Sequence, residues 1–433
     1  MLLRKHPVSS IAALSALLFA QSVFAADTLT GALTGGKASA NLQYRYEDVR
    51  NAAAAANTAT AHTVRLRLGY ETATFNGFGA MVEAESVTDL GNKKYNGTNP
   101  VNATYATILD PEVTEINQSY LSYSGIANTN VKWGRQRLIL DNHRFIGDVG
   151  WRQNQQTFDA FTLVNKSLPS TTITASYLTN ANRVIGDGVA GGNHRMQSPI
   201  ININYKGWSF AEVVGYAYLL DYEPVGAGVT TNASSADTYG IRLNGSTPMG
   251  GNKLLYTAEY ANQTDGSNNT TSFDIDYTFL EAGVDVTGIA VFKLGYEVLG
   301  TDTAAVTKAT SAVTNRSFAT PLATLHAHNG WADMFAAATP TQGLKDAYVS
   351  VNGKLAGINL GVVYHDYTAD KTTATLTSSS LGNEWGLVGT YAFNKNTTVG
   401  LKYADYTAKG TTATTFGTNV NTQKTWLWGA FNF

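Results

Sequence analysis

The chain has 433 residues, no cysteine, and 30 Lys and Arg against 32 Asp and Glu. Without cysteines it cannot be stabilised by disulfides, and without a basic excess it lacks the charge that nucleic-acid binding requires. We therefore expect no disulfide framework and no nucleic-acid partner.

The N-terminus has the pattern of a secretory signal. Arg4 and Lys5 precede an apolar run at 11–20, which is followed by a small-residue cleavage pattern. The run is shorter than the roughly 20 residues that a membrane-spanning helix needs. The sequence therefore predicts a signal peptide at 1–25 and an exported domain at 26–433. Because no later apolar run is long enough for such a helix, the chain could span a membrane only as a closed barrel.

The stretch TVRLRLGYET at 63–72 shows strict alternation. It places Leu66 and Leu68 on one side of an extended chain, and Arg65 and Arg67 on the other. In a soluble sandwich the leucines would form the core, whereas in a membrane barrel they would face lipid and the arginines would line a polar interior. This strand alone does not decide between the two.

Eighteen segments of this kind follow one another through the chain. They begin near Ala38, His62, Phe78, Thr114, Asn130, Thr157, Thr171, Pro199, Ser209, Asp237, Lys253, Phe273, Ile289, Gly343, Gly357, Leu381, Thr397 and Thr422. Short turns follow the even-numbered segments and long polar loops follow the odd ones. This sorting favours an all-β transmembrane antiparallel barrel, with short periplasmic turns and long extracellular loops.

The last segment, TWLWGAFNF, ends at Phe433 and places Leu427, Gly429 and Phe431 on the same face. A terminal aromatic residue on an alternating strand is similar to the signal that the outer-membrane assembly machinery recognises. We therefore expect this machinery and the lipid of a Gram-negative outer membrane to be partners of the chain.

Two longer stretches carry a family resemblance. They are residues 131–161, with the pieces Gly134-Arg135-Gln136 and Trp151-Arg152-Gln153, and residues 317–335, with Asn329-Gly330-Trp331-Ala332-Asp333. With the strand count and Phe433, they resemble the alginate-export family of outer-membrane porins. The resemblance implies an 18-stranded barrel whose pore carries an anionic polysaccharide such as alginate, or small solutes.

An alginate conduit needs an excess of positive charge in its lumen. The alternation places seven cations inside: Arg45, Arg65, Arg67, Arg242, Lys253, Lys293 and Lys402. It places nine carboxylates there as well: Glu47, Glu71, Glu83, Glu85, Glu259, Glu281, Asp285, Glu297 and Glu384. This mixed lumen predicts modest charge selectivity rather than a polyanion conduit.

The segment from Gly134 to Asp159 concentrates charge. It carries Arg135, Arg137, Arg144 and Arg152 with Asp141, Asp148 and Asp159. If it folds inward it would constrict the pore with opposed charges. Alternatively, these residues brace one another at the barrel wall, because Arg forks commonly pair with carboxylates. With Arg65, Arg67, Arg242, Glu281, Lys293 and Glu297 from the strands, they are our candidate pore-lining and constriction residues.

The long connection near 301–342 contains His326, His328 and Asp333. Two histidines two residues apart could bind a metal. No third ligand has recognisable spacing, and a polar loop with the turn at Asn329-Gly330-Trp331 explains the same residues, so we prefer that interpretation and assign no metal. A connection of this length favours a lid or plug.

The composite prediction is a channel for small hydrophilic solutes, possibly anionic ones or an alginate-like polysaccharide, with no cofactor and no catalytic residue. We expect a monomer. A non-conducting adhesin or structural barrel is one alternative. A barrel hydrolase is another, although neither a Gly-x-Ser-x-Gly elbow nor a His-Glu-x-x-His pair is present. Neither the solute nor the direction of transport follows from the sequence.

Overall fold

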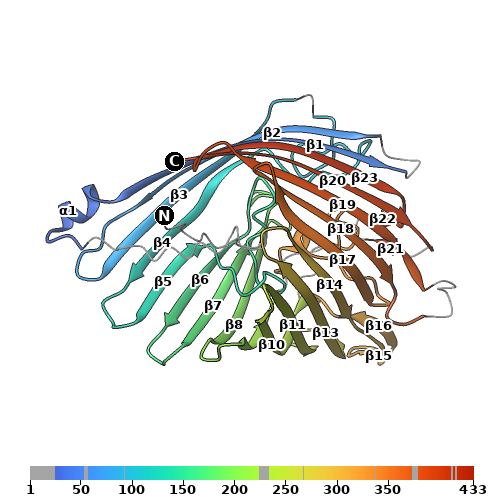
Figure 1. Cartoon of the computed structure of the whole chain (residues 1–433). Helices are drawn as coiled ribbons and strands as arrows, with labels where there is room; N and C mark the ends of the chain where they lie inside the picture. The colour runs from blue at the N-terminus through green and yellow to red at the C-terminus, as the bar shows by residue number, and fades with distance from the viewer. Residues whose placement is uncertain are drawn as a thin grey trace.

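A computed structural model describes residues 25–52, 57–91, 93–223, 234–266, 268–336, 338–372, 379–410, 413–414 and 417–433. The expected signal peptide lies outside these residues, apart from Ala25. The described chain forms one antiparallel sheet of 18 strands that closes on itself (Figure 1).

The first nine strands of the barrel are β1 (Lys37–Asn51), β2 (Ala59–Glu71), β3 (Phe78–Asp89), β4 (Val113–Tyr123), β5 (Thr129–Gln136), β6 (Thr157–Asn165), β7 (Thr171–Asn182), β8 (Asn193–Tyr205) and β9 (Ala211–Leu220). The other nine are β10 (Ala236–Met249), β11 (Asn252–Asp265), β13 (Asp274–Val286), β14 (Ala290–Leu299), β17 (Leu344–Leu355), β18 (Ile358–Thr368), β19 (Ser380–Ala392), β20 (Thr397–Ala408) and β23 (Thr422–Asn432). The short elements outside this sheet are α1 (Leu29–Thr34), β12 (Thr271–Ser272), β15 (Thr301–Thr307), β16 (Val313–Ser317), η3 (Leu325–Ala327), β21 (Ala413–Thr414) and β22 (Gly417–Thr418).

The barrel closes between its first and last strands. β1 pairs with β2 on one side and with β23 on the other, so that Leu42 lies opposite both Leu66 and Phe431. This seam leaves the sheet without a free edge. The predicted barrel of 18 strands is confirmed.

One strand begins earlier than the alternation predicts. β8 starts at Asn193 rather than near Pro199, and Asn182 of β7 pairs with Asn193. The residues before Pro199 are mostly polar. Apolar alternation is therefore absent there, although the backbone ladder continues.

Connections alternate between two rims, because consecutive strands are antiparallel neighbours. Two-residue turns at 250–251 and 356–357 lie on one rim. The long connections, including 90–112, 137–156 and 300–343, start from the other. These short turns and long connections therefore lie on opposite rims of the barrel, as the sequence predicts.

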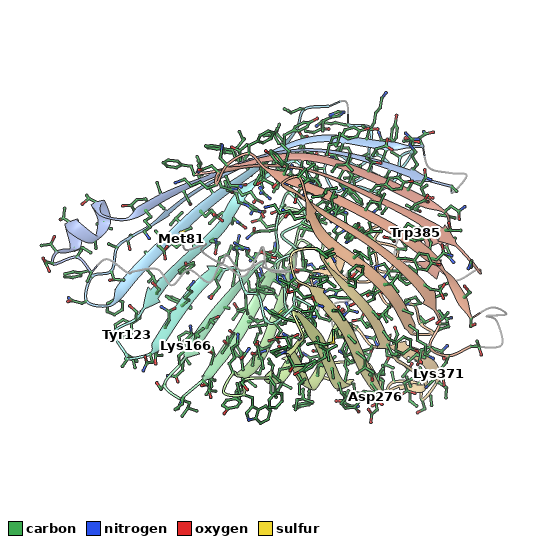
Figure 2. The ribbon with its side chains drawn as sticks, viewed as in Figure 1. Met81, Tyr123, Lys166, Asp276, Lys371 and Trp385 are labelled. Atoms are coloured by element: carbon green, nitrogen blue, oxygen red, sulfur yellow. The ribbon has the colours of Figure 1, made fainter. Side chains whose placement is uncertain are left out.

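The two faces of the wall differ as the barrel interpretation requires. Arg65 is 4% exposed, whereas Leu68 is 53% exposed. Trp385, labelled in Figure 2, is also exposed on the outer face. The apolar side of the strand at 63–72 is therefore the outside. No helix within the described residues is long and apolar enough to cross a membrane.

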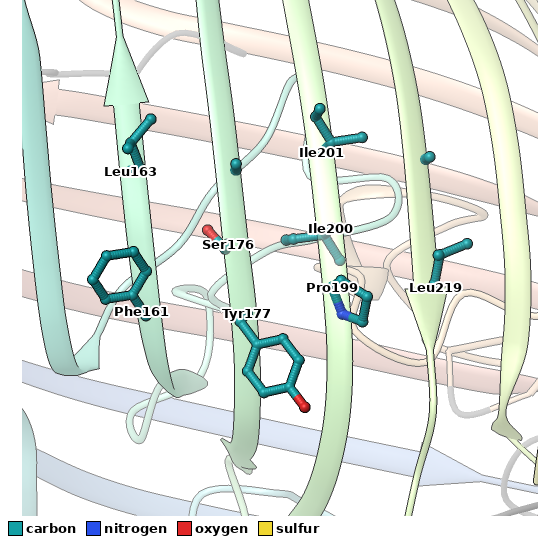
Figure 3. Close-up of a pocket in the computed structure, with 10 residues that line it drawn as sticks. Phe161, Leu163, Ser176, Tyr177, Pro199, Ile200, Ile201 and Leu219 are labelled. Atoms are coloured by element: carbon teal, nitrogen blue, oxygen red, sulfur yellow. The ribbon is translucent and has the colours of Figure 1, made fainter.

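A shallow apolar hollow lies on the outer surface, over β6 to β9 (Figure 3). Phe161, Tyr177, Pro199, Ile201 and Leu219 line it, with a volume of about 420 Å³. It lies on the apolar outer wall, so it contributes nothing to the polar interior that could conduct solutes.

Candidate functional site

Two long connections lie inside the barrel instead of at its rim. We call residues 137–156 the first inner segment and residues 318–343 the second inner segment. Gly147 N of the first donates to Leu322 O of the second at 2.9 Å. Gln156 Nε2 donates to the same carbonyl at 3.0 Å. The two inner segments therefore pack against each other, and both bond to inward-facing side chains of the wall.

Arg152 joins both inner segments to the barrel seam. Its guanidinium lies 3.0 Å from Glu47 of β1 and 3.1 Å from Asp333 of the second inner segment. Lys424 of β23 lies 2.8 Å from the same Asp333 carboxylate. We call Glu47, Arg152, Asp333 and Lys424 the seam cluster. All four are buried, so water screens these pairs little and their geometry is tightly specified.

His326 extends the seam cluster. Its Nδ1 lies 2.6 Å from Asp333, and its Nε2 lies 3.1 Å from Lys402 Nζ on β20. Burial lowers the pKa of His326 to about 3, so the ring is neutral, donates to Asp333 and accepts from Lys402. Burial acts to raise the pKa of Asp333, but its contacts with His326, Lys424 and Arg152 hold that pKa well below the ordinary value.

His328 turns to a different partner, Asn142 O, at 3.2 Å. The two histidine rings therefore have different partners and do not meet at one place where they could bind a metal ion. Within the described residues, no group of three or more His, Cys, Asp or Glu side chains could hold a metal ion.

Arg144 anchors the first inner segment to a different part of the wall. Its Nε and Nη2 lie 2.7 and 3.2 Å from the two carboxylate oxygens of Glu297 on β14. Tyr277 of β13 donates to Glu297 at 2.7 Å, and Asn329 of the second inner segment accepts from Arg144 at 3.1 Å. This bidentate pair is one of the stronger kinds of ionic contact.

Aromatic rings surround Phe145, the residue next to Arg144. Its ring centroid lies 5.2 Å from Tyr216, 5.4 Å from Tyr277 and 6.0 Å from Phe318. These spacings are those of favourable aromatic pairs. The inner face of this part of the wall is therefore packed by rings, and the first inner segment fills the space between them.

Asp141 and Arg242 are two further charged residues of the interior, and each has partners of its own. Asp141 accepts a hydrogen bond from Asn202 at 2.8 Å, and burial raises its pKa to about 6. Arg242 of β10 pairs with Glu259 of β11 at 2.5 Å. Each of these charges thus has a local partner.

Two further strand cations are paired with carboxylates of neighbouring strands. Lys293 of β14 lies 2.9 Å from Glu281 of β13, and Arg67 of β2 pairs with Glu85 of β3. Arg65 differs, because it bonds the amide oxygen of Asn41 at 2.6 Å and Gln153 O at 3.2 Å. It therefore attaches the first inner segment to β2 through neutral acceptors.

Arg137 and Arg135 lie at the entry to the first inner segment and behave differently. Arg137 pairs with Asp148 within the segment at 2.5 Å and keeps a side chain 40% exposed. Arg135 pairs with Asp159 of the adjacent strand at 2.9 Å. Arg135 lies two residues after Trp133 in β5 and therefore on the same face of the sheet, and Trp133 is 66% exposed on the outer face. Arg135 and Asp159 therefore lie apart from the interior clusters.

Three residues that contact the seam cluster or its neighbours were not among the candidate pore-lining residues. Asp110, from the connection at 90–112, lies 3.2 Å from Arg45 and accepts from Gln153 N at 2.9 Å. Lys424 and Trp151 complete the contacts around the seam. No local pattern marks Asp110. The alternation that puts Leu427 and Phe431 on the outer face puts Lys424 on the interior face of the last strand, and Trp151 stands in the Trp-Arg-Gln piece that carries the family resemblance.

A closed barrel with an apolar outer face, an ionic interior and long connections folded into that interior is a membrane β-barrel of the channel type. The alginate export family matches residues 37–297, more than half of the chain, and the chain therefore belongs to this family.

Solved outer-membrane proteins share the fold. OccAB2 of Acinetobacter baumannii has a TM-score of 0.69 at 13% identity, over 92% of this chain and 98% of that chain. OpdK of Pseudomonas aeruginosa, crystallised with vanillate, has a TM-score of 0.66 at 13% identity, over 92% of this chain and 99% of that chain. No curated protein matches the sequence. At these identities the likeness is one of fold.

Proposed function

We propose that the protein is a passive outer-membrane channel for small hydrophilic solutes, in which the two inner segments form the constriction. One observation carries the proposal: Arg152 is held between Glu47 of the wall and Asp333 of the second inner segment, at 3.0 and 3.1 Å. A polar interior crossed by fixed, charged segments selects solutes by width and charge pattern.

The constriction in this proposal is made from residues of the first inner segment and of the facing wall. They are Arg137, Asp141, Arg144, Asp148 and Arg152, with Arg65, Arg67, Arg242, Glu281, Lys293 and Glu297. Arg135 and Asp159 brace β5 against β6 instead, since their partners are each other. Constriction and bracing thus belong to different residues.

The paired charges favour small solutes over a polyuronate. Arg144 faces Glu297, Arg242 faces Glu259 and Lys293 faces Glu281. A polyuronate must exchange its counterions for fixed cations along the path, and cations already neutralised by carboxylates serve this poorly. Export of an alginate-like polysaccharide is the second candidate, favoured by the family to which the chain belongs.

The remaining parts of the proposal concern the export of the chain and the assembly of the barrel in the outer membrane. Residues 1–25 direct export and are then removed, and the C-terminal strand ending at Phe433 engages the assembly machinery. The barrel works as a monomer, without cofactor or catalysis.

Planar-bilayer recording of the purified protein tests the function. We expect steady open-channel conductance with modest ion selectivity. Vesicle swelling should be faster with monosaccharides and monouronates than with oligouronates. A protein that inserts and never conducts would overturn the proposal and favour an adhesin or structural barrel. Preferential passage of oligouronates would favour the polysaccharide route.

A further inference from the structure

Trp151, next to Arg152 in the first inner segment, lies close to two cations of the wall. The Arg45 guanidinium carbon of β1 lies 4.4 Å from the Trp151 ring centroid, and Lys402 Nζ of β20 lies 3.6 Å from it. The Trp151 carbonyl also accepts a hydrogen bond from Arg45. Indole is the ring best suited to bind cations through its face.

Other rings complete the enclosure of the Lys402 ammonium. His326 stacks on Trp151 with ring centroids 4.6 Å apart and planes 6° apart. Trp331 of the second inner segment places its centroid 4.5 Å from Lys402 Nζ, and Trp426 lies edge-on to Trp151 at 5.7 Å. Rings from both inner segments and from β23 therefore cover one ammonium of β20.

Lys402 differs from two other interior lysines, Lys293 and Lys424, in its partners. Lys293 and Lys424 have carboxylate partners at 2.9 and 2.8 Å. Within the described part of the chain, no carboxylate lies within ion-pair distance of Lys402, whose ammonium contacts His326 Nε2 at 3.1 Å. It is nevertheless only 7% exposed. Its charge is thus covered by ring faces and left without a counter-ion in direct contact.

We propose that Trp151 is a specificity-determining residue, which keeps the positive charge of Lys402 out of the solute path. This inference rests on the proposed channel function. Arg45 is already paired with Asp110 at 3.2 Å, so Lys402 is the cation whose charge the indole covers. Without the indole, Lys402 gains access to the water of the lumen, and fixed positive charge beside a narrow path raises the local concentration of anions. Anion preference then increases, although no charged residue has been replaced.

The test compares Trp151→Ala, Trp151→Phe and the double variant Trp151→Ala with Lys402→Met. Trp133→Ala is the matched tryptophan control, since Trp133 lies on the outer face. Folding of each barrel is first checked by its heat-dependent migration on gels. The two measurements are the reversal potential in a salt gradient and the labelling of Lys402 by a water-soluble amine-acylating reagent, read by mass spectrometry.

For Trp151→Ala we expect a reversal potential shifted toward anions and a several-fold rise in Lys402 labelling. Trp151→Phe should keep most of the wild-type behaviour, Trp133→Ala all of it, and the double variant should lose most of the shift. A folded Trp151→Ala barrel with wild-type labelling and reversal potential overturns the inference, as does a shift that persists in full without Lys402. If the wild type never conducts, the proposed function fails, whereas labelling still decides whether Trp151 covers Lys402.

Discussion

The first inner segment contacts its surroundings through different kinds of side chain around Phe145 and around Arg152. Around Phe145, wall and segment meet through aromatic rings, with Tyr216, Tyr277 and Phe318 within 6.0 Å. Around Arg152 they meet through buried ion pairs with Glu47 and Asp333. Ring packing tolerates changes of shape, whereas a buried charge tolerates no loss of its partner. We call the part around Phe145 the aromatic end and the part around Arg152 the ionic end, although Arg144 beside Phe145 also has a buried pair with Glu297. Removing the Arg152 charge should therefore cost more stability than replacing the Phe145 ring.

The largest expected effect comes from breaking the ionic end. Arg152→Met leaves Glu47 and Asp333 without their shared cation, and we expect a loss of about 3–5 kcal/mol in unfolding free energy. Denaturant unfolding in detergent micelles measures it. Arg135→Met is the matched control, because its partly exposed pair with Asp159 should contribute only about 0–1 kcal/mol. Equal midpoints for Arg152→Met and wild type would refute the ionic anchor.

A smaller effect is expected at the aromatic end. Phe145→Leu keeps most of the buried volume and removes the ring contacts, so the loss should stay below about 1.5 kcal/mol. The same unfolding measurement applies, with reversal potential as a second reading that should not change. A loss as large as that of Arg152→Met would remove the distinction between the two ends.

Charge selectivity should follow the exposed arginine rather than the buried ones. Arg137 is the candidate, because its side chain is 40% exposed and charges beyond about 8–10 Å are screened at ordinary salt. Arg137→Gln should shift the reversal potential modestly toward cations, while Arg135→Gln should not. Identical shifts for both would mean that neither position lies at the narrow part of the path.

The smallest effect concerns pH. Burial raises the pKa of Asp141 to about 6, so this carboxyl is neutral below that pH and negative above it. Cation preference should therefore increase slightly as pH rises from 5 to 7. In Asp141→Asn this slope should vanish, and a slope that survives the substitution would assign it to another group.

The strand series could be predicted because each wall strand alternates between lipid-facing and interior residues. That signal fails wherever the outer side is not apolar, as before Pro199 in β8. In the sequence, the first inner segment is visible as a concentration of arginines and aspartates, and the second as a connection long enough to favour a lid or plug. Their partners Glu47, Asp110 and Asp333 are contributed by β1 and by two separate loops, and no local periodicity specifies which distant carboxylate meets which arginine. The shared side of Trp133 and Arg135 was visible in the alternation, but the pairing of Arg135 with Asp159 needed the register of β5 and β6.

The position of the seam cluster has a consequence for the order of events during assembly. Glu47 belongs to β1 and Lys424 to β23, and these strands become neighbours only when the barrel closes. Arg152 and Asp333 can make all their contacts only after the last strand has joined the first. The seam cluster is therefore completed only when the barrel closes, and a barrel still open at its seam would lack the contacts that join both inner segments to β1 and β23.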